Sequence, residues 1–324
     1  MDTNAKIQLR HLGKTDILVT PIGLGVMEMA GGGGLIGSMF PVIPQEEKNA
    51  IIKAALDGGI NWFDTAEMYG AGVSERSLAI GLKAAGKSDK DVIVATKWQP
   101  FLRTARNIPV SIADRLRFLD GYSIANYMVH QPYSFSSPEA EMNAMADLVE
   151  AGKIRSVGVS NFNPARMRRA HAALAKRGLP LAVNQMRYSL LSREIETNGV
   201  LETAKELGMT ITAYTPLGRG LLSGKYHKNP ELLNRMKGVR KAMMQRNLER
   251  SRPLINVMDE MAARYGVTIA QVALNWVINF NGETVVTIPG ATKVRQAEEA
   301  AGAMKFQLTK DEMARLDELS RSLS

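Results

Sequence analysis

Short runs of β-branched and apolar residues alternate with amphipathic segments along most of the chain, and this alternation constrains the fold more than any other feature. Eight runs are predicted as strands, at residues 21–24, 61–64, 91–96, 124–129, 156–160, 181–184, 210–214 and 284–288. Strand–helix alternation repeated eight times indicates an α/β fold in which a parallel sheet closes into a (β/α)8 TIM barrel. An open doubly wound sheet is the alternative.

The segments between the runs carry the start signals of helices. Ser and Asn are good N-caps, and proline is favoured at the first helical position. A Thr with Glu three residues later forms a capping box. The helix starts predicted in this way are Ser137–Pro138, Asn163–Pro164 and Thr309–Glu312.

Three segments lie outside the barrel pattern. Residues 7–9 and 17–19, with Gly13 between them, predict a β-hairpin ahead of the barrel. Residues 31–44 form a glycine-rich loop, which lacks the strand–GxGxxG–helix context of a phosphate cradle. Residues 225–252 form a basic insertion. We therefore expect one barrel domain over residues 1–324, with an N-terminal hairpin and long loops at the C-terminal face.

Composition narrows the function classes. The chain has 324 residues, no cysteine and four scattered histidines, so cysteine-ligated metal sites are excluded and no metal-ligand spacing is present. We expect a cytoplasmic protein without a signal or membrane segment. The net charge is +9, and residues 225–252 hold nine Lys or Arg against two Glu. No nucleic-acid motif accompanies them, so we interpret this stretch as a solvated insertion, with attraction of a phosphate-bearing ligand as the alternative.

Polar residues follow the predicted strands at their C-terminal ends. In a barrel these ends converge on one mouth, where active sites lie. The residues in these positions are Asp64, Lys97, His130, Asn161, Gln185 and Tyr214, with Gly290 after the last strand and Tyr69 five residues beyond Asp64.

This set is suited to proton transfer at a carbonyl. Tyrosine is a sluggish acid at neutral pH, but an ammonium such as that of Lys97 favours the phenolate, and a carboxylate such as Asp64 keeps the lysine charged. His130 can hydrogen-bond a substrate oxygen. Because no nucleophile–base pair is evident, we expect the electron pair to arrive as a hydride from a cofactor.

Six motifs in order carry a resemblance to a known family. They are Asp64-Thr65-Ala66-Glu67-Met68-Tyr69-Gly70, Ala95-Thr96-Lys97-Trp98, Val129-His130-Gln131-Pro132, Val157-Gly158-Val159-Ser160-Asn161-Phe162, Ala213-Tyr214-Thr215-Pro216-Leu217-Gly218 and Ile288-Pro289-Gly290-Ala291. Over nearly the whole chain this pattern resembles the aldo-keto reductases. The glycine-containing run from Leu217 to Lys225 resembles the branch with potassium-channel β-subunits and bacterial relatives.

The resemblance implies NADP(H)-dependent reduction of an aldehyde or ketone, with a small-molecule carbonyl substrate and neither a nucleic acid nor a membrane as partner. Tyr69 would be the general acid, Lys97 held by Asp64 would lower its pKa, and His130 would orient the carbonyl. Met27 and Trp98 would line the substrate pocket. The cofactor residues it implies are Ser160, Asn161, Gln185, Tyr214, Thr215, Pro216, Leu217, Gly218, Gly220, Lys225, Gly290, Thr292, Lys293, Arg295, Gln296 and Glu299.

The chain departs from the family pattern near the cofactor. Ala300 follows Glu299 where the family often has asparagine, and Thr292 stands where a basic residue is usual. Val26 and Met27 stand where a threonine–tryptophan pair is common in the channel-associated members that the chain resembles. Two other functions stay open: an NADPH-sensing regulatory subunit with slow turnover, and a barrel lyase that uses Lys97 as a Schiff base.

Overall fold

The computed structural model describes residues 7–32, 41–235 and 238–323. Eight strands form one sheet in which every neighbouring pair is parallel. They are β3 (Leu24–Gly25), β4 (Trp62–Asp64), β5 (Ile93–Trp98), β6 (Ile124–Val129), β7 (Ile154–Ser160), β8 (Leu181–Arg187), β9 (Thr210–Tyr214) and β10 (Val285–Thr287). The order in the sheet is the order in the chain.

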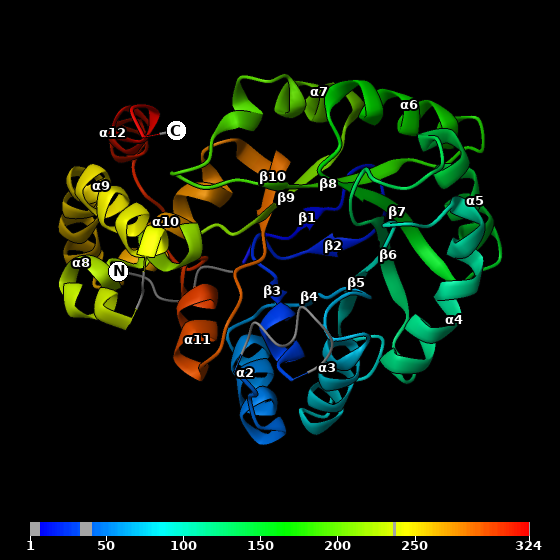
Figure 1. Cartoon of the computed structure of the whole chain (residues 1–324), viewed down its shortest axis with the longest axis horizontal. Coiled ribbons are helices and arrows are strands. Elements are labelled where there is room, and N and C mark those ends of the chain that lie inside the picture. The colour runs from blue at the N-terminus through cyan, green and yellow to red at the C-terminus, as the bar shows by residue number, and fades with distance from the viewer. Residues whose placement is uncertain (1–6, 33–40, 236–237, 324) are drawn as a thin grey trace.

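The sheet closes on itself. Parallel bridges join Ile22 to Thr287 and Gly25 to Gly290, so the first strand lies beside the last. An open doubly wound sheet would leave its edge strands apart. The predicted (β/α)8 barrel is therefore confirmed, and Figure 1 shows the helices arranged around the strands.

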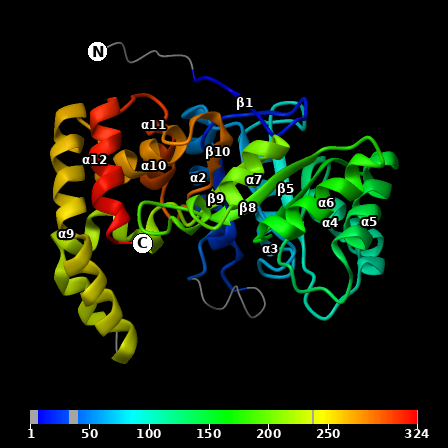
Figure 2. The same ribbon diagram turned by 90° about the horizontal axis from the view of Figure 1, so that it is seen from above.

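The predicted hairpin is also confirmed, with β1 (Arg10–His11) antiparallel to β2 (Leu18–Val19), so that its first strand begins at residue 10 and not at residue 7. Gly13 forms the turn with φ +60, and a Cβ there would lie 2.5 Å from the Ala182 carbonyl oxygen. Its amide donates to Thr210 Oγ1 at 2.8 Å. Because these partners lie at the start of β8 and β9, the hairpin covers the amino-terminal end of the barrel, opposite the carboxyl ends of the strands (Figure 2).

Helices follow the strands and begin where the capping residues predict. Ser137, Asn163 and Thr309 each accept a hydrogen bond from the backbone three residues later. The longer helices are α2 (Gln45–Asp57), α3 (Val73–Ala84), α4 (Ile108–Leu119), α5 (Pro138–Glu150), α6 (Pro164–Ala175), α7 (Val200–Leu207), α9 (Gly238–Tyr265), α10 (Ile269–Asn279), α11 (Val294–Gly302) and α12 (Lys310–Arg321). The short ones are η1 (Met27–Ala30), η2 (Ala105–Asn107), η3 (Glu194–Glu196), η4 (Gly218–Ser223), α8 (Lys225–Lys228), η5 (Pro230–Arg235) and η6 (Gly282–Thr284).

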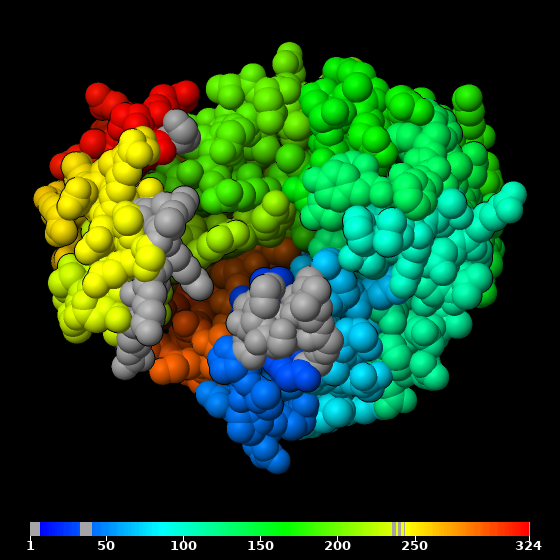
Figure 3. Space-filling view, viewed as in Figure 1, coloured from blue at the N-terminus to red at the C-terminus, as the bar shows by residue number. Residues whose placement is uncertain are grey.

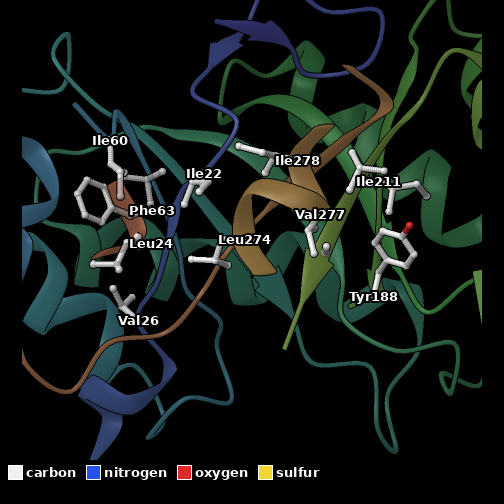
Figure 4. Packing of buried hydrophobic residues seen from close by; sticks show 14 of the residues in the cluster. Ile22, Leu24, Val26, Ile60, Phe63, Tyr188, Ile211, Leu274, Val277 and Ile278 are labelled. Atoms are coloured by element: carbon white, nitrogen blue, oxygen red, sulfur yellow. The ribbon is translucent and has the colours of Figure 1, made fainter. Parts of the chain in front are cut away.

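Apolar side chains form two layers, one inside the barrel and one between the barrel and its helices. Ala95 belongs to the inner layer, whereas Val94 and Trp98 belong to the outer one. Side chains alternate along a strand, so Lys97 shares the inner face with Ala95. Figure 4 shows the outer layer where α10 packs between the first strand and β9.

In the residues described, the basic insertion is mostly helical and comprises α8, η5 and the first part of α9. Leu221, Leu233 and Leu248 form a separate buried cluster that fixes it to η4. Residues 33–40 of the predicted glycine-rich loop lie outside the described residues. Within the described part of the chain, no helix has both the length and the apolar character needed to cross a membrane.

Candidate active site

A buried ion pair between Lys97 and Asp64 lies at the carboxyl ends of β4 and β5. Lys97 Nζ donates to Asp64 Oδ1 at 2.5 Å and to the Thr65 carbonyl oxygen at 2.7 Å. The side chains are 0% and 2% exposed. Gln185 Nε2 donates to the other Asp64 oxygen at 2.9 Å. These hydrogen bonds offset the high cost of removing two charges from water.

Burial acts on the pKa of both partners. It lowers the pKa of Lys97 and raises the pKa of Asp64, and in each case the charge of the other residue opposes the shift. The ammonium is therefore held by the carboxylate, as predicted from the sequence.

Tyr69 is placed between this pair and His130. The Lys97 Nζ lies 5.1 Å from the centroid of the Tyr69 ring, and the Tyr69 and His130 rings meet edge to face with centroids 5.6 Å apart. The loop that carries Tyr69 is fixed at Glu67, which accepts from Arg103 at 2.6 Å and from the Gln99 amide at 2.9 Å. The phenol, ammonium, carboxylate and imidazole predicted from strand ends thus lie together.

The protonation states of Tyr69 and His130 suit a general acid and a neutral hydrogen-bond donor, respectively. Burial raises the pKa of Tyr69 well above its ordinary value, and the charges of Asp64 and then Glu28 raise it further. The sequence predicted that the Lys97 ammonium would lower this pKa, and that prediction is wrong because burial and the charges of Asp64 and Glu28 raise it. Burial, aided by Lys97, holds the pKa of His130 well below its ordinary value. At neutral pH Tyr69 therefore carries its proton, and the His130 imidazole is neutral.

An amide cluster lies beside the catalytic candidates. Tyr214 Oη donates to Asn161 Oδ1 at 3.0 Å. The Asn161 amide nitrogen donates to Ser160 Oγ at 3.0 Å and to Gln131 Oε1 at 3.2 Å. Ser160 Oγ donates to the Gln185 carbonyl oxygen at 3.0 Å. The four predicted nicotinamide-binding residues are thus joined in one network, with the half-buried ring of Tyr214 at its edge.

Unusual backbone conformations gather at the mouth. Among the described residues, six non-glycine residues have positive φ: Ala71, Leu102, Asp120, Asn161, Thr215 and Arg219. All but Asp120 follow the carboxyl ends of strands. Such strained residues cluster at functional sites. The turn after β9 combines Thr215, Gly218, Arg219 and Gly220 in this conformation and then leads to Lys225 at the start of α8.

The predicted adenosine-binding residues lie together at the start of α11. Gln296 Oε1 accepts from the amides of Thr292 at 2.7 Å and Lys293 at 3.2 Å. Arg295 pairs with Glu299 at 2.7 Å and is 80% exposed. In Figure 3, α11 (orange) lies between α2 (blue) and the α8–α9 region (yellow-green to yellow) at the left.

Trp98 does not lie where it was predicted. Its indole is 0% exposed within the outer layer, and its N–H donates to Asn107 Oδ1 at 3.0 Å. Because it follows the inward-facing Lys97 directly, its side chain points to the helices and not into the mouth. Met27, the other predicted pocket residue, lies in η1 at the mouth and is partly exposed.

Two features of the site were missed from sequence. Glu28 follows the first strand in η1, and it escaped notice because the predicted strand stopped at residue 24 and no polar residue was assigned to its end. The Glu67–Arg103 pair joins two loops whose contact no local pattern encodes.

The chain resembles known proteins over most of its length. It matches the family described as Aldo/keto reductase over residues 21–321. It is 33% identical over 315 residues to the chloroplastic pyridoxal reductase of Arabidopsis thaliana. This match covers 92% of this chain and 82% of that protein. A solved thermostable aldo-keto reductase in complex with the inhibitor epalrestat is 28% identical, with a TM-score of 0.75 and coverage of 96% of this chain and 99% of that one. An aldo/keto reductase from Klebsiella pneumoniae, solved with NADP and acetate, is 25% identical, with a TM-score of 0.73 and coverage of 96% and 94%.

The chain therefore belongs to the aldo/keto reductase family. Membership supports an oxidoreductase whose general chemistry is carbonyl reduction, with a small molecule as substrate.

Proposed function

We propose that this protein reduces aldehydes or ketones to alcohols with NADPH, and that Tyr69 is the general acid. The observation that carries the proposal is the meeting of a protonated phenol, a neutral imidazole and a buried ion pair at one barrel mouth. When bound, the reduced nicotinamide supplies the hydride. The protein's own residues then have to orient the carbonyl and provide a proton.

The described residues fit a dinucleotide. Asn161 and Gln185 offer amide groups for a carboxamide, and the half-buried face of Tyr214 suits a flat ring. We assign Ser160 to the same nicotinamide end. Further along, the pyrophosphate would follow Thr215, Pro216, Leu217, Gly218, Gly220 and Lys225. The adenosine half would lie against Gly290, Thr292, Gln296 and Glu299. Lys293 and Arg295 are exposed cations suited to a 2′-phosphate.

The geometry supports the following proton steps. His130 orients the substrate carbonyl oxygen as a neutral donor. Tyr69 gives its proton to the same oxygen as negative charge develops there, and the Lys97 ammonium, 5.1 Å from the centroid of the Tyr69 ring, favours the phenolate that results. Asp64 keeps that ammonium oriented through its 2.5 Å contact.

The side chains at the barrel mouth also indicate which class of carbonyl compound is the substrate. Phe101, Tyr133 and Phe135 are 62%, 64% and 71% exposed on the loops after β5 and β6. The Phe135 amide donates to the Arg103 carbonyl oxygen at 2.9 Å, which joins the two loops. Exposed aromatic side chains at a mouth favour substrates with an apolar or aromatic body. Met27 would contact such a substrate from η1.

The test measures consumption of NADPH by the purified full chain with a panel of aliphatic and aromatic aldehydes and ketones. The panel includes pyridoxal because one relative is named pyridoxal reductase. We expect turnover of at least one aromatic aldehyde and its near-complete loss in Tyr69→Phe. NADPH binding with no reduction above background would instead support the sensing subunit. Trapping of a substrate on Lys97 by borohydride would support the lyase. A cytoplasmic location stays a prediction.

A further inference from the structure

Glu28 is a carboxyl group at the mouth to which the proposed mechanism assigns no role. It is the second residue of η1, the short helix that follows β3. A Cβ placed on Gly290 would lie 2.4 Å from both of its carboxylate oxygens, so the carboxyl group contacts the Gly290 backbone in the segment that follows β10. The Gly25–Gly290 bridge brings these two segments together. Glu28 thus lies beside the proposed adenosine half of the cofactor site.

The carboxyl group is poorly satisfied. The side chain as a whole is partly exposed, but its Oε2 atom is buried and has no hydrogen-bond partner among the described residues. Burial raises the pKa of Glu28 to about 7, opposed only by its own backbone N–H. A buried polar atom without a partner needs an explanation, and a ligand is one.

The charged groups on the neighbouring elements do not compensate this carboxylate. In the loop after β4, the negative charge of Glu28 raises the pKa of Tyr69. On β5, Lys97 is paired with Asp64. On α3, Glu75 accepts from Thr96 and pairs with Arg115, while Arg76 lies over the Phe118 ring.

On α11, Arg295 pairs with Glu299, and Lys293, the residue just before this helix, is exposed. Across the described part of the chain, no ion pair joins any cation to Glu28, although pairs are recorded for many other carboxylates. An anionic Glu28 would therefore repel a phosphate-bearing ligand at this place.

We propose that Glu28 is a cofactor-contacting residue that binds the dinucleotide as a neutral carboxylic acid, with its buried oxygen in a hydrogen bond to an oxygen of the ligand. The proposal rests on the proposed NADP(H) site. A protonated carboxyl group can donate to phosphate or ribose oxygens, whereas a carboxylate beside phosphates faces like charge. The bound ligand therefore raises the proton affinity of Glu28 further, and binding takes up a proton.

This linkage fixes the sign of the pH dependence. Below the pKa of free Glu28 the group is already protonated, and affinity is at its maximum. As the pH rises above about 7, each pH unit should weaken cofactor affinity about tenfold, until the pKa of the bound state is reached. At pH values about one unit above the free pKa, binding should take up close to one proton.

The experiment is calorimetric titration of the full chain with NADP+ and with NADPH, in two buffers of different ionisation enthalpy, at several pH values from neutral to alkaline. The buffer difference counts the protons taken up without using activity. Glu28→Gln keeps a neutral hydrogen-bonding group of the same shape, and we expect it to bind without proton uptake and with affinity that no longer falls with pH. Glu298→Gln, which removes an exposed carboxylate from α11, is the matched control and should behave as the wild type.

The outcomes separate the two proposals. Wild-type binding without proton uptake would overturn the role of Glu28 and leave the cofactor site standing. The role of Glu28 is likewise overturned if Glu28→Gln keeps the wild-type pH dependence, or if this variant stays folded by thermal unfolding yet loses binding at every pH. If the wild type binds neither cofactor form, the proposed function itself fails, and the role of Glu28 fails with it.

Discussion

Replacing Lys97 by methionine should destabilise the fold through Asp64, and the size of the effect can be worked from the contacts. The substitution removes the donor at 2.5 Å and leaves a carboxylate that is 2% exposed with only Gln185 as a remaining side-chain partner. Removing one member of a buried ion pair costs about 3–5 kcal/mol. For a chain of this length that corresponds to a fall of about 4–8 °C in the melting temperature.

The double variant Asp64→Asn/Lys97→Met separates this cost from lost packing. It removes both charges, so it should be less destabilised than the sum of the two single variants by several kcal/mol in a double-mutant cycle. The single Lys97→Met variant should also regain stability at low pH. Without the ammonium the pKa of Asp64 is raised still more, so the folded state binds its proton more tightly than the unfolded state does. Stability is then present below that pKa and lost as the pH rises through it.

The assay is thermal unfolding of the wild type, both single variants and the double variant across a range of pH, with circular dichroism as the signal. Near-additive losses would refute the reasoning, because they would show that the two charges do not depend on each other. An unchanged melting temperature in Lys97→Met would refute the claim that Asp64 is buried with its charge.

Three further outcomes follow from the site. Tyr69→Phe should lower kcat about 10²–10⁴-fold while NADPH affinity by fluorescence titration is retained, and full rate would exclude Tyr69 as the acid. Alanine at both Lys293 and Arg295 should weaken NADPH binding much more than NADH binding, and an equal effect on both would remove the 2′-phosphate assignment. Because the pKa of Tyr69 is raised and that of His130 is lowered, kcat for reduction at saturating cofactor should stay level through neutral pH and fall only in alkali. The rate of alcohol oxidation should increase with pH. A reduction rate that falls between pH 6 and 8 would contradict these protonation states.

Local sequence determined the elements of this protein and the order of its catalytic candidates. The strands at residues 124–129 and 210–214 have the predicted bounds, and the caps at Ser137, Asn163 and Thr309 form as expected. These features depend on neighbours within a few positions, which a sequence displays directly. The strand-end positions of Asp64, Lys97 and His130 follow from the same patterns, because parallel strands all end at one mouth.

Tertiary structure decided the protonation states of the site residues and the positions of the side chains that no local pattern predicts. Trp98 faces the helices because Lys97 occupies the inward phase of β5. The pKa of Tyr69 rises because of burial and of carboxylates from other segments, and Glu28 Oε2 is buried without a hydrogen-bond partner among the described residues. Desolvation and Coulomb interactions depend on distance in space, and the spacing of residues along the chain does not encode that distance.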